Sequence, residues 1–91
     1  MRFLSPFTES FQAAVAYYIA SDKTIAARFI TAVDEAQDKI IQFPKIGRLV
    51  GPYREFRLNG FPYNYCYHEN LDGEIVAVVL HHHRQNDSRP Y

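Results

Sequence analysis

The sequence predicts an α+β fold in which a hairpin of two helices packs on an antiparallel β-sheet, in the order β-α-α-β-β-β. Three observations support this fold. Apolar residues recur at helical spacing up to position 44, side chains alternate in character after position 52, and glycine-containing turns separate the alternating stretches. Because 91 residues can enclose only one hydrophobic core, we expect residues 1–91 to form a single domain.

The first helix is expected after a short strand at residues 1–4. Ser5-Pro6 or Thr8 provides its start and its cap, and the pattern continues to about Ala20. Its apolar face comprises Phe7, Phe11, Val15 and Tyr18. Spacings of four, four and three residues place these side chains on one side of a helix, where we expect them to pack in the core.

A second helix is expected from Ser21 or Asp22, either of which can cap it, to Phe43, and Pro44 ends it. Its apolar stripe comprises Ile25, Phe29, Val33, Ala36, Ile40 and Phe43. Only two or three residues separate the two helices, so they should fold back on each other as an antiparallel pair with both stripes in the core.

The second half is expected to contain a loop, Lys45 to Pro52, and then a meander of three strands. The predicted strands are Tyr53 to Leu58, Phe61 to His68 and Glu74 to His82. Asn59-Gly60 suits a two-residue hairpin turn in which both residues adopt positive φ, and Asp72-Gly73 offers the same chemistry.

Alternation in the middle strand gives it one aromatic face. This face comprises Phe61, Tyr63, Tyr65 and Tyr67. We expect these rings in the core or on the sheet surface, with stacking against a partner as the alternative. Ile75 to Leu80 is apolar on both faces, which indicates a strand covered on both sides.

The overall composition provides no global electrostatic field to attract nucleic acid, because ten Lys and Arg balance ten Asp and Glu. A single cysteine, Cys66, cannot form an internal disulfide, and a packed thiol is favoured over a nucleophile. The sequence shows neither a secretory leader nor a long apolar span, so we expect a cytoplasmic protein without a membrane partner.

Three consecutive histidines, His81 to His83, raise the possibility of a metal site. Neighbouring side chains on a strand point to opposite faces, so at most His81 and His83 could converge, and no Cys or carboxylate pair lies nearby in sequence. We therefore expect neither a metal nor a cofactor, and interpret the histidines as a strand end or a contact with a partner.

Several motifs occur together in the order typical of one protein family. In the first half these are Ala27-Arg28-Phe29, Phe43-Pro44 and Gly47-Arg48. In the second half they are Arg57, Phe61-Pro62-Tyr63, Tyr65, Tyr67 and Val78-Val79-Leu80-His81, followed by Arg84 and an imperfect Arg89-Pro90-Tyr91 ending. In these motifs the chain resembles the RelE/ParE superfamily of toxins.

The resemblance implies a toxin of a type II toxin–antitoxin system, neutralised by a cognate antitoxin. ParE-like members poison DNA gyrase, whereas RelE-like members cut messenger RNA in the ribosome. For a gyrase poison, we expect Arg57, His81 and Arg84 to contact the target. Either Tyr17 or Tyr18 must face outward and is a candidate antitoxin contact. No sequence-specific DNA binding is expected from the toxin alone.

A ribonuclease of this superfamily needs an acid, a base and cations around the phosphate. The candidates are Arg57, His83 or Arg84, and Tyr91. Arg54 cannot join Arg57 there, because residues three apart on a strand point to opposite faces.

Two observations favour the gyrase poison, a non-catalytic toxin, over the ribonuclease. RelE-like ribonucleases carry an Arg after the middle-strand Tyr, where this chain has Tyr63-Asn64, and Asn supplies no positive charge. Residues 45–91 hold six basic and five acidic side chains, a net charge of +1, which is little for a ribosome-binding surface. The alternatives are a RelE-like messenger RNA endoribonuclease and a degenerate member of low toxicity. In each case the antitoxin is expected to wrap the toxin, using a sheet edge or the groove beside the helices.

Overall fold

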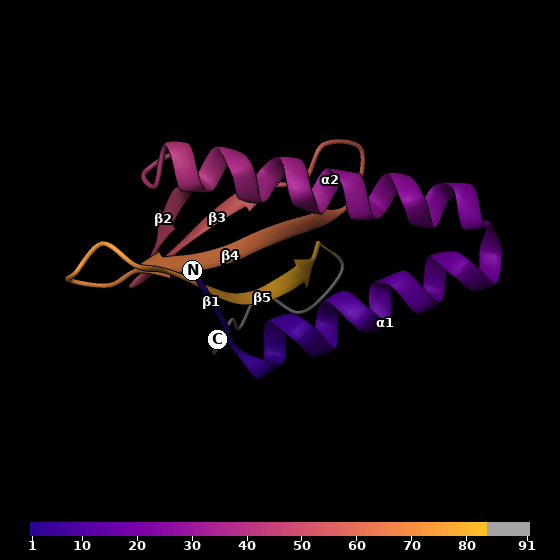
Figure 1. Ribbon diagram of the computed structural model, residues 1–91, viewed down its shortest axis with the longest axis horizontal. Coiled ribbons are helices and arrows are strands. Elements are labelled where there is room, and N and C mark those ends of the chain that lie inside the picture. Colours follow the sequence, from indigo (N-terminus) through magenta and orange to yellow (C-terminus); the bar gives the residue numbers. More distant parts are fainter. Residues whose placement is uncertain (84–91) are drawn as a thin grey trace.

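Two antiparallel helices cover one face of a five-stranded sheet (Figure 1), which confirms the predicted α+β architecture. The computed structural model describes residues 1–83. Its elements are β1 (Arg2–Phe3), α1 (Ser5–Ser21), α2 (Lys23–Gln42), β2 (Arg48–Val50), β3 (Tyr53–Arg57), β4 (Tyr63–Glu69) and β5 (Ile75–His82). Within the described residues, neither helix is both long and apolar enough to cross a membrane.

The strands lie in the order β1-β5-β4-β3-β2. Strands β2 to β5 form the predicted antiparallel meander, but β1 runs parallel to β5, with Arg2 opposite Val76 and Phe3 opposite Ala77. The sheet is therefore mixed, and the expectation of a purely antiparallel sheet was wrong at this edge. The chain between these two parallel strands contains both helices and strands β2 to β4.

Strand β2 was not predicted, because its three residues lie inside the expected loop Lys45 to Pro52. It pairs with β3 through Arg48 opposite Glu55 and Val50 opposite Tyr53. A three-residue edge strand with mostly exposed side chains shows no alternation between buried and exposed positions, so no pattern identified it.

Helix α2 begins as predicted, because the Asp22 carboxylate accepts a hydrogen bond from the Thr24 backbone N–H at 2.8 Å. Helix α1 begins differently: Leu4 occupies the N-cap position without a side-chain cap, and Pro6 lies in the first turn. Asp22 alone connects the two helices, a shorter connection than the expected two or three residues.

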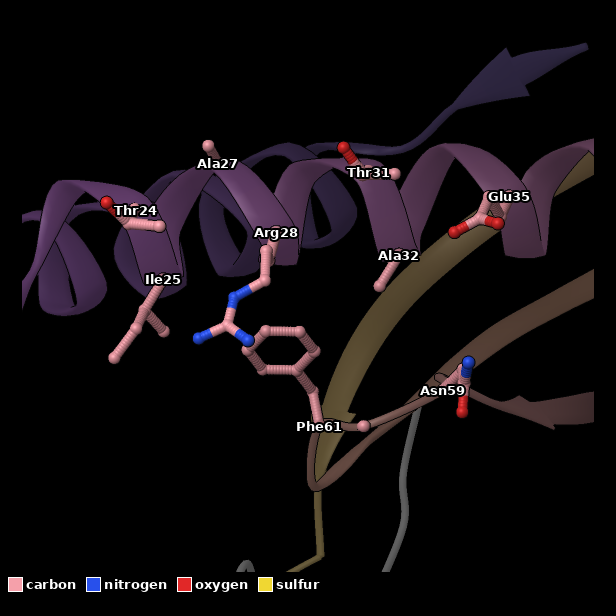
Figure 2. Close-up of a pocket in the computed structure, with 10 residues that line it drawn as sticks. Thr24, Ile25, Ala27, Arg28, Thr31, Ala32, Glu35, Asn59 and Phe61 are labelled. Atoms are coloured by element: carbon pink, nitrogen blue, oxygen red, sulfur yellow. The ribbon is translucent and has the colours of Figure 1, made fainter.

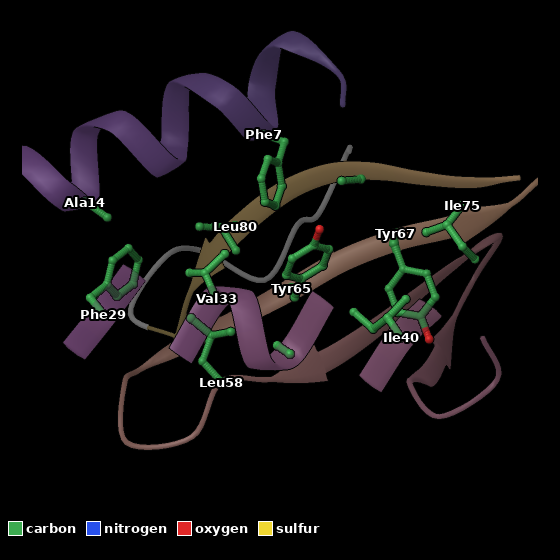
Figure 3. Close-up of a cluster of buried hydrophobic side chains, with 12 residues drawn as sticks. Phe7, Ala14, Phe29, Val33, Ile40, Leu58, Tyr65, Tyr67, Ile75 and Leu80 are labelled. Atoms are coloured by element: carbon green, nitrogen blue, oxygen red, sulfur yellow. The ribbon is translucent and has the colours of Figure 1, made fainter. Parts of the chain in front are cut away.

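The core lies between the helices and the sheet (Figure 3). Its largest members are Phe7, Phe29, Val33, Ile40, Leu58, Tyr65, Tyr67 and Leu80. The predicted stripes and the aromatic face of β4 thus meet, with Phe29 fully buried at their centre. Phe43 is an exception: α2 ends one residue before it, so its side chain leaves the helical stripe and is exposed.

The connection from β3 to β4 is longer than the predicted two-residue turn, because β3 ends at Arg57 and β4 begins only at Tyr63. Gly60 has a positive φ of 83°, but Asn59 does not. The cause is Phe61, whose ring packs against Tyr18 and Phe29 with centroid distances of 5.3 and 5.2 Å. This packing draws Phe61 out of the strand. The β4–β5 turn also differs from its prediction, because Gly73 has a positive φ and Asp72 does not.

The loop between α2 and β2 is held by the side chain of Tyr67. Its hydroxyl donates to the Pro44 carbonyl at 2.7 Å and accepts from the Gly47 N–H at 3.0 Å. Burial raises the pKa of Tyr67, so the hydroxyl keeps its proton and can donate. A Cβ on Gly47 would lie 2.8 Å from the same hydroxyl oxygen, so only glycine permits this approach.

Replacing Tyr67 with phenylalanine should lower the free energy of unfolding by about 1–3 kcal/mol, because buried backbone groups lose their partner. Urea denaturation would measure the loss. Tyr17→Phe is the matched control, since this exposed hydroxyl should change stability by less than about 0.5 kcal/mol. Equal effects of the two substitutions would contradict the role assigned to Tyr67.

Candidate functional site

The sheet face away from the helices gathers a set of polar side chains. Register places Glu55 opposite Cys66, and Asn64 opposite both Arg57 and His81. Tyr65 and Tyr67 point into the core, so their strand neighbours face the other way. Arg54 lies opposite Tyr67, on the helix side, which confirms that it cannot share a site with Arg57.

The centre of this face is the Glu55 carboxylate, whose residue is only 5% exposed. It accepts hydrogen bonds from the Asn64 amide at 3.4 Å and from the Cys66 thiol at 3.6 Å. The Arg48 guanidinium lies 3.7 Å away as an ion-pair partner. These donors compensate a buried carboxylate that would otherwise be costly. Cys66 is therefore a packed thiol, as its sequence context predicted.

His83 joins the same network through Asn64, whose Oδ1 lies 3.1 Å from His83 Nε2. Carboxylate oxygens only accept hydrogen bonds, so the Asn64 amide nitrogen must face Glu55 and its carbonyl oxygen must face His83. A carbonyl oxygen also only accepts, so His83 Nε2 must carry hydrogen. In the neutral ring, Nδ1 is then the acceptor. The Glu55–Asn64–His83 network thus fixes the tautomer of this histidine.

The electrostatic environment keeps the His83 ring neutral. Burial lowers its pKa, and Arg57, His82 and His81 lower it further, while Glu55 opposes them weakly. Because the ordinary pKa of histidine is about 6.5, a lowered value leaves the ring uncharged at pH 7. The face therefore presents a neutral acceptor beside the Arg57 cation.

The structure brings Arg57, His81 and His83 to one face, as their predicted roles require. Arg57 is exposed, whereas His81 is buried. Arg84 and Tyr91, the other predicted site residues, lie outside the described residues. Within residues 1–83, no three His, Cys, Asp or Glu side chains are arranged to hold a metal ion.

Glu55 and Asn64 were not predicted as members of the site. From the sequence, Asn64 is informative only through the positive charge it lacks. The sequence does offer one signal for Glu55. It lies in the middle of a five-residue strand, where burial of an unpaired carboxylate is costly, so a partner is required. The partner could not be identified without the strand register.

A groove of about 650 Å³ lies between α1 and the ends of β4 and β5. Tyr17, Tyr18, Tyr63 and His82 line it. Tyr17 is 69% exposed, whereas Tyr18 packs on Phe29, so Tyr17 is the outward-facing tyrosine of the pair. The groove thus combines an apolar wall with an accessible aromatic ring, a combination suited to a protein partner.

A second groove, of about 570 Å³, lies on the other side of the β3–β4 connection. Figure 2 shows Ile25 and Arg28 extending from α2 toward the loop that carries Phe61. Phe61 lines this groove and Pro62 lines the first one, so the same loop forms a wall of both.

The model of a family described as the ParE toxin of the type II toxin–antitoxin system parDE matches residues 1–86. No curated protein matched by sequence. A solved structure titled "Chromosomal ParDE TA system from P. aeruginosa" has a similar fold, with a TM-score of 0.73 and 17% identity, covering 89% of this chain and 91% of that one.

Proposed function

The chain belongs to the ParE toxin family of type II toxin–antitoxin systems, and on that premise we propose that it inhibits growth by poisoning DNA gyrase. In this proposal it acts in the cytoplasm without catalysing a reaction, and a cognate antitoxin neutralises it. Its role is to bind its target through a small surface presented by the last three strands.

The observation that carries this proposal is the position of Asn64 between Glu55 and His83. An RNA phosphate approaching Arg57 on this face would meet the Glu55 carboxylate nearby, and like charges repel. The lowered pKa of His83 also leaves that ring uncharged at pH 7, so it adds no positive charge for binding a phosphate. The network therefore favours a protein-binding surface over a ribonuclease centre.

We assign contact with gyrase to Arg57 and Arg84, with His81 supporting them from a buried position. We assign antitoxin binding to the groove beside α1, where Tyr17 provides the exposed ring and Tyr18 the wall. An apolar helix face laid into this groove would bury both aromatic and aliphatic surface.

Inducing the protein without its antitoxin should stop growth, and purified protein should inhibit supercoiling by gyrase. Arg57→Ala should weaken inhibition at least about tenfold, the effect of losing one charged hydrogen bond. Arg2→Ala, an exposed arginine on β1, is the matched control and should have no effect. Cut messenger RNA with normal gyrase activity would overturn the proposal in favour of the ribonuclease, and normal growth would indicate a degenerate toxin.

A further inference from the structure

Four large apolar side chains are exposed where α2 ends and β2 begins. They are Ile41, Phe43, Ile46 and Leu49, and we call this surface the α2–β2 end. Phe43 and Leu49 are each 62% exposed. Figure 1 shows that the end of α2 and strand β2 lie at the same end of the molecule. Scattered exposed apolar residues are ordinary, but four within nine residues indicate a binding surface.

The backbone between α2 and β2 is held in place, so these side chains do not lie on a loose loop. Tyr67 binds the backbone of Pro44 and Gly47, and the Arg54 guanidinium donates to the Gly47 carbonyl at 2.8 Å. The Ile46 N–H also donates to the Phe43 carbonyl at 2.9 Å. A surface ordered before binding loses less entropy when a partner docks.

The segment that carries this surface is more basic than the whole chain, whose net charge is zero. Residues 39–54 contain four basic side chains and no acidic one. Arg54 is used in holding the loop and Arg48 pairs with Glu55 on the other face of the sheet, but Lys39 and Lys45 are exposed. The α2–β2 end therefore combines apolar surface with positive charge, which favours an acidic partner with apolar side chains.

Strand β2 is the outermost strand on this side of the sheet. An outermost strand offers backbone groups to an added strand, and alternate side chains of that strand then contact the same face. The geometry therefore suits an extended segment more than a helix.

We propose that the α2–β2 end binds an extended segment of the antitoxin in which acidic and apolar residues alternate. This inference rests on the proposed neutralisation by an antitoxin. A second copy of the toxin fits less well, because it would bring Lys39 and Lys45 toward their own equivalents. A nucleic acid would match the charge but would leave Phe43 and Leu49 against phosphates.

The position of the surface gives it a distinct role in the complex. The groove beside α1 lies along β5, near one edge of the sheet, and β2 forms the other edge. A segment that occupies both surfaces passes across the toxin, and the second contact benefits from the high local concentration that the first creates.

The test is the affinity of the purified antitoxin for four toxin variants, measured by titration calorimetry at low and high salt. Leu49→Glu and Lys45→Glu should each weaken binding at least about tenfold, because they place an acid opposite acidic residues. Ile30→Glu and Lys23→Glu are controls, because they place an acid at exposed apolar and basic positions elsewhere on α2 and should not alter affinity. Circular dichroism verifies that all four variants fold.

The outcomes separate this inference from the proposed function. Unchanged affinity of Leu49→Glu and Lys45→Glu, with tight binding by the unmodified toxin, overturns the inference and leaves neutralisation intact. If the unmodified toxin does not bind the antitoxin, the proposed neutralisation fails, and the inference fails with it. Loss of self-association in Leu49→Glu, or of binding to a 20-base-pair DNA, with antitoxin affinity unchanged would assign the surface to those partners instead.

Discussion

Replacing Phe29 with alanine should lower the free energy of unfolding by about 3–5 kcal/mol, the largest loss we expect from a single core substitution. Phe29 is fully buried between the helices and the sheet. Its ring contacts the rings of Phe11, Tyr18, Phe61 and Tyr63. These residues come from α1, from the β3–β4 connection and from β4, so the cavity would weaken the attachment of all three. Small domains have only about 5–15 kcal/mol of stability, so the loss would be severe.

Chemical denaturation with urea would measure this change, and Ile30→Ala provides the matched control. Ile30 is the next residue on the same helix, but its side chain is exposed. Its truncation should change stability by less than about 0.5 kcal/mol. A loss below about 1 kcal/mol for Phe29→Ala would show that the cluster repacks around the missing ring.

Replacing Asn64 with aspartate should raise the pKa of His83 and destabilise the sheet face away from the helices. The new carboxylate would lie where Asn64 Oδ1 now accepts from His83, and it favours the charged imidazolium. Its other oxygen would replace the amide that donates to Glu55 at 3.4 Å, so two carboxylates would face each other. Removing the donor and adding a like charge both act against the folded state.

Nuclear magnetic resonance titration of the imidazole would measure the pKa, and Asn64→Leu is the control of similar size. Leucine removes the hydrogen bonds without adding charge, so His83 should keep a lowered pKa and lose its fixed tautomer. In the unmodified protein the folded pKa lies below the unfolded value of about 6.5. The unfolded chain then binds the proton first, so this residue's contribution to stability falls as the pH drops below about 6.5. Asn64→Asp should weaken or reverse that trend; an unchanged His83 pKa would contradict the network.

The fold was largely predictable because its periodic segments are long. The stripe from Phe29 to Ile40 continues through three turns of α2, and the aromatic alternation of β4 supplies the opposite wall of the core. Prediction failed for elements defined by tertiary contacts. Strand β2 exists because β3 is beside it, and Phe61 leaves the strand because Tyr18 and Phe29 attract its ring.

The site was predictable only in part, for a related reason. The alternation rule placed Arg54 and Arg57 on opposite faces, and the resemblance selected Arg57 and His81. The hydrogen bonds of Glu55 and Asn64 depend on which residue of β3 lies opposite which residue of β4, and an offset of one residue would have separated them. Sequence alone does not specify that register.

The parallel pairing of β1 with β5 has a consequence for the order in which the protein folds during synthesis. Residues 2 and 3 are made more than 70 residues before their partners, residues 76 and 77. The sheet therefore stays incomplete until β5 has been translated, about 4–15 s after β1 at ordinary elongation rates. Strand β5, which carries His81, is the last to join. A chain that ends before residue 75 lacks β5, so the proposed target-binding surface, to which β5 contributes His81, forms only after that strand has been made.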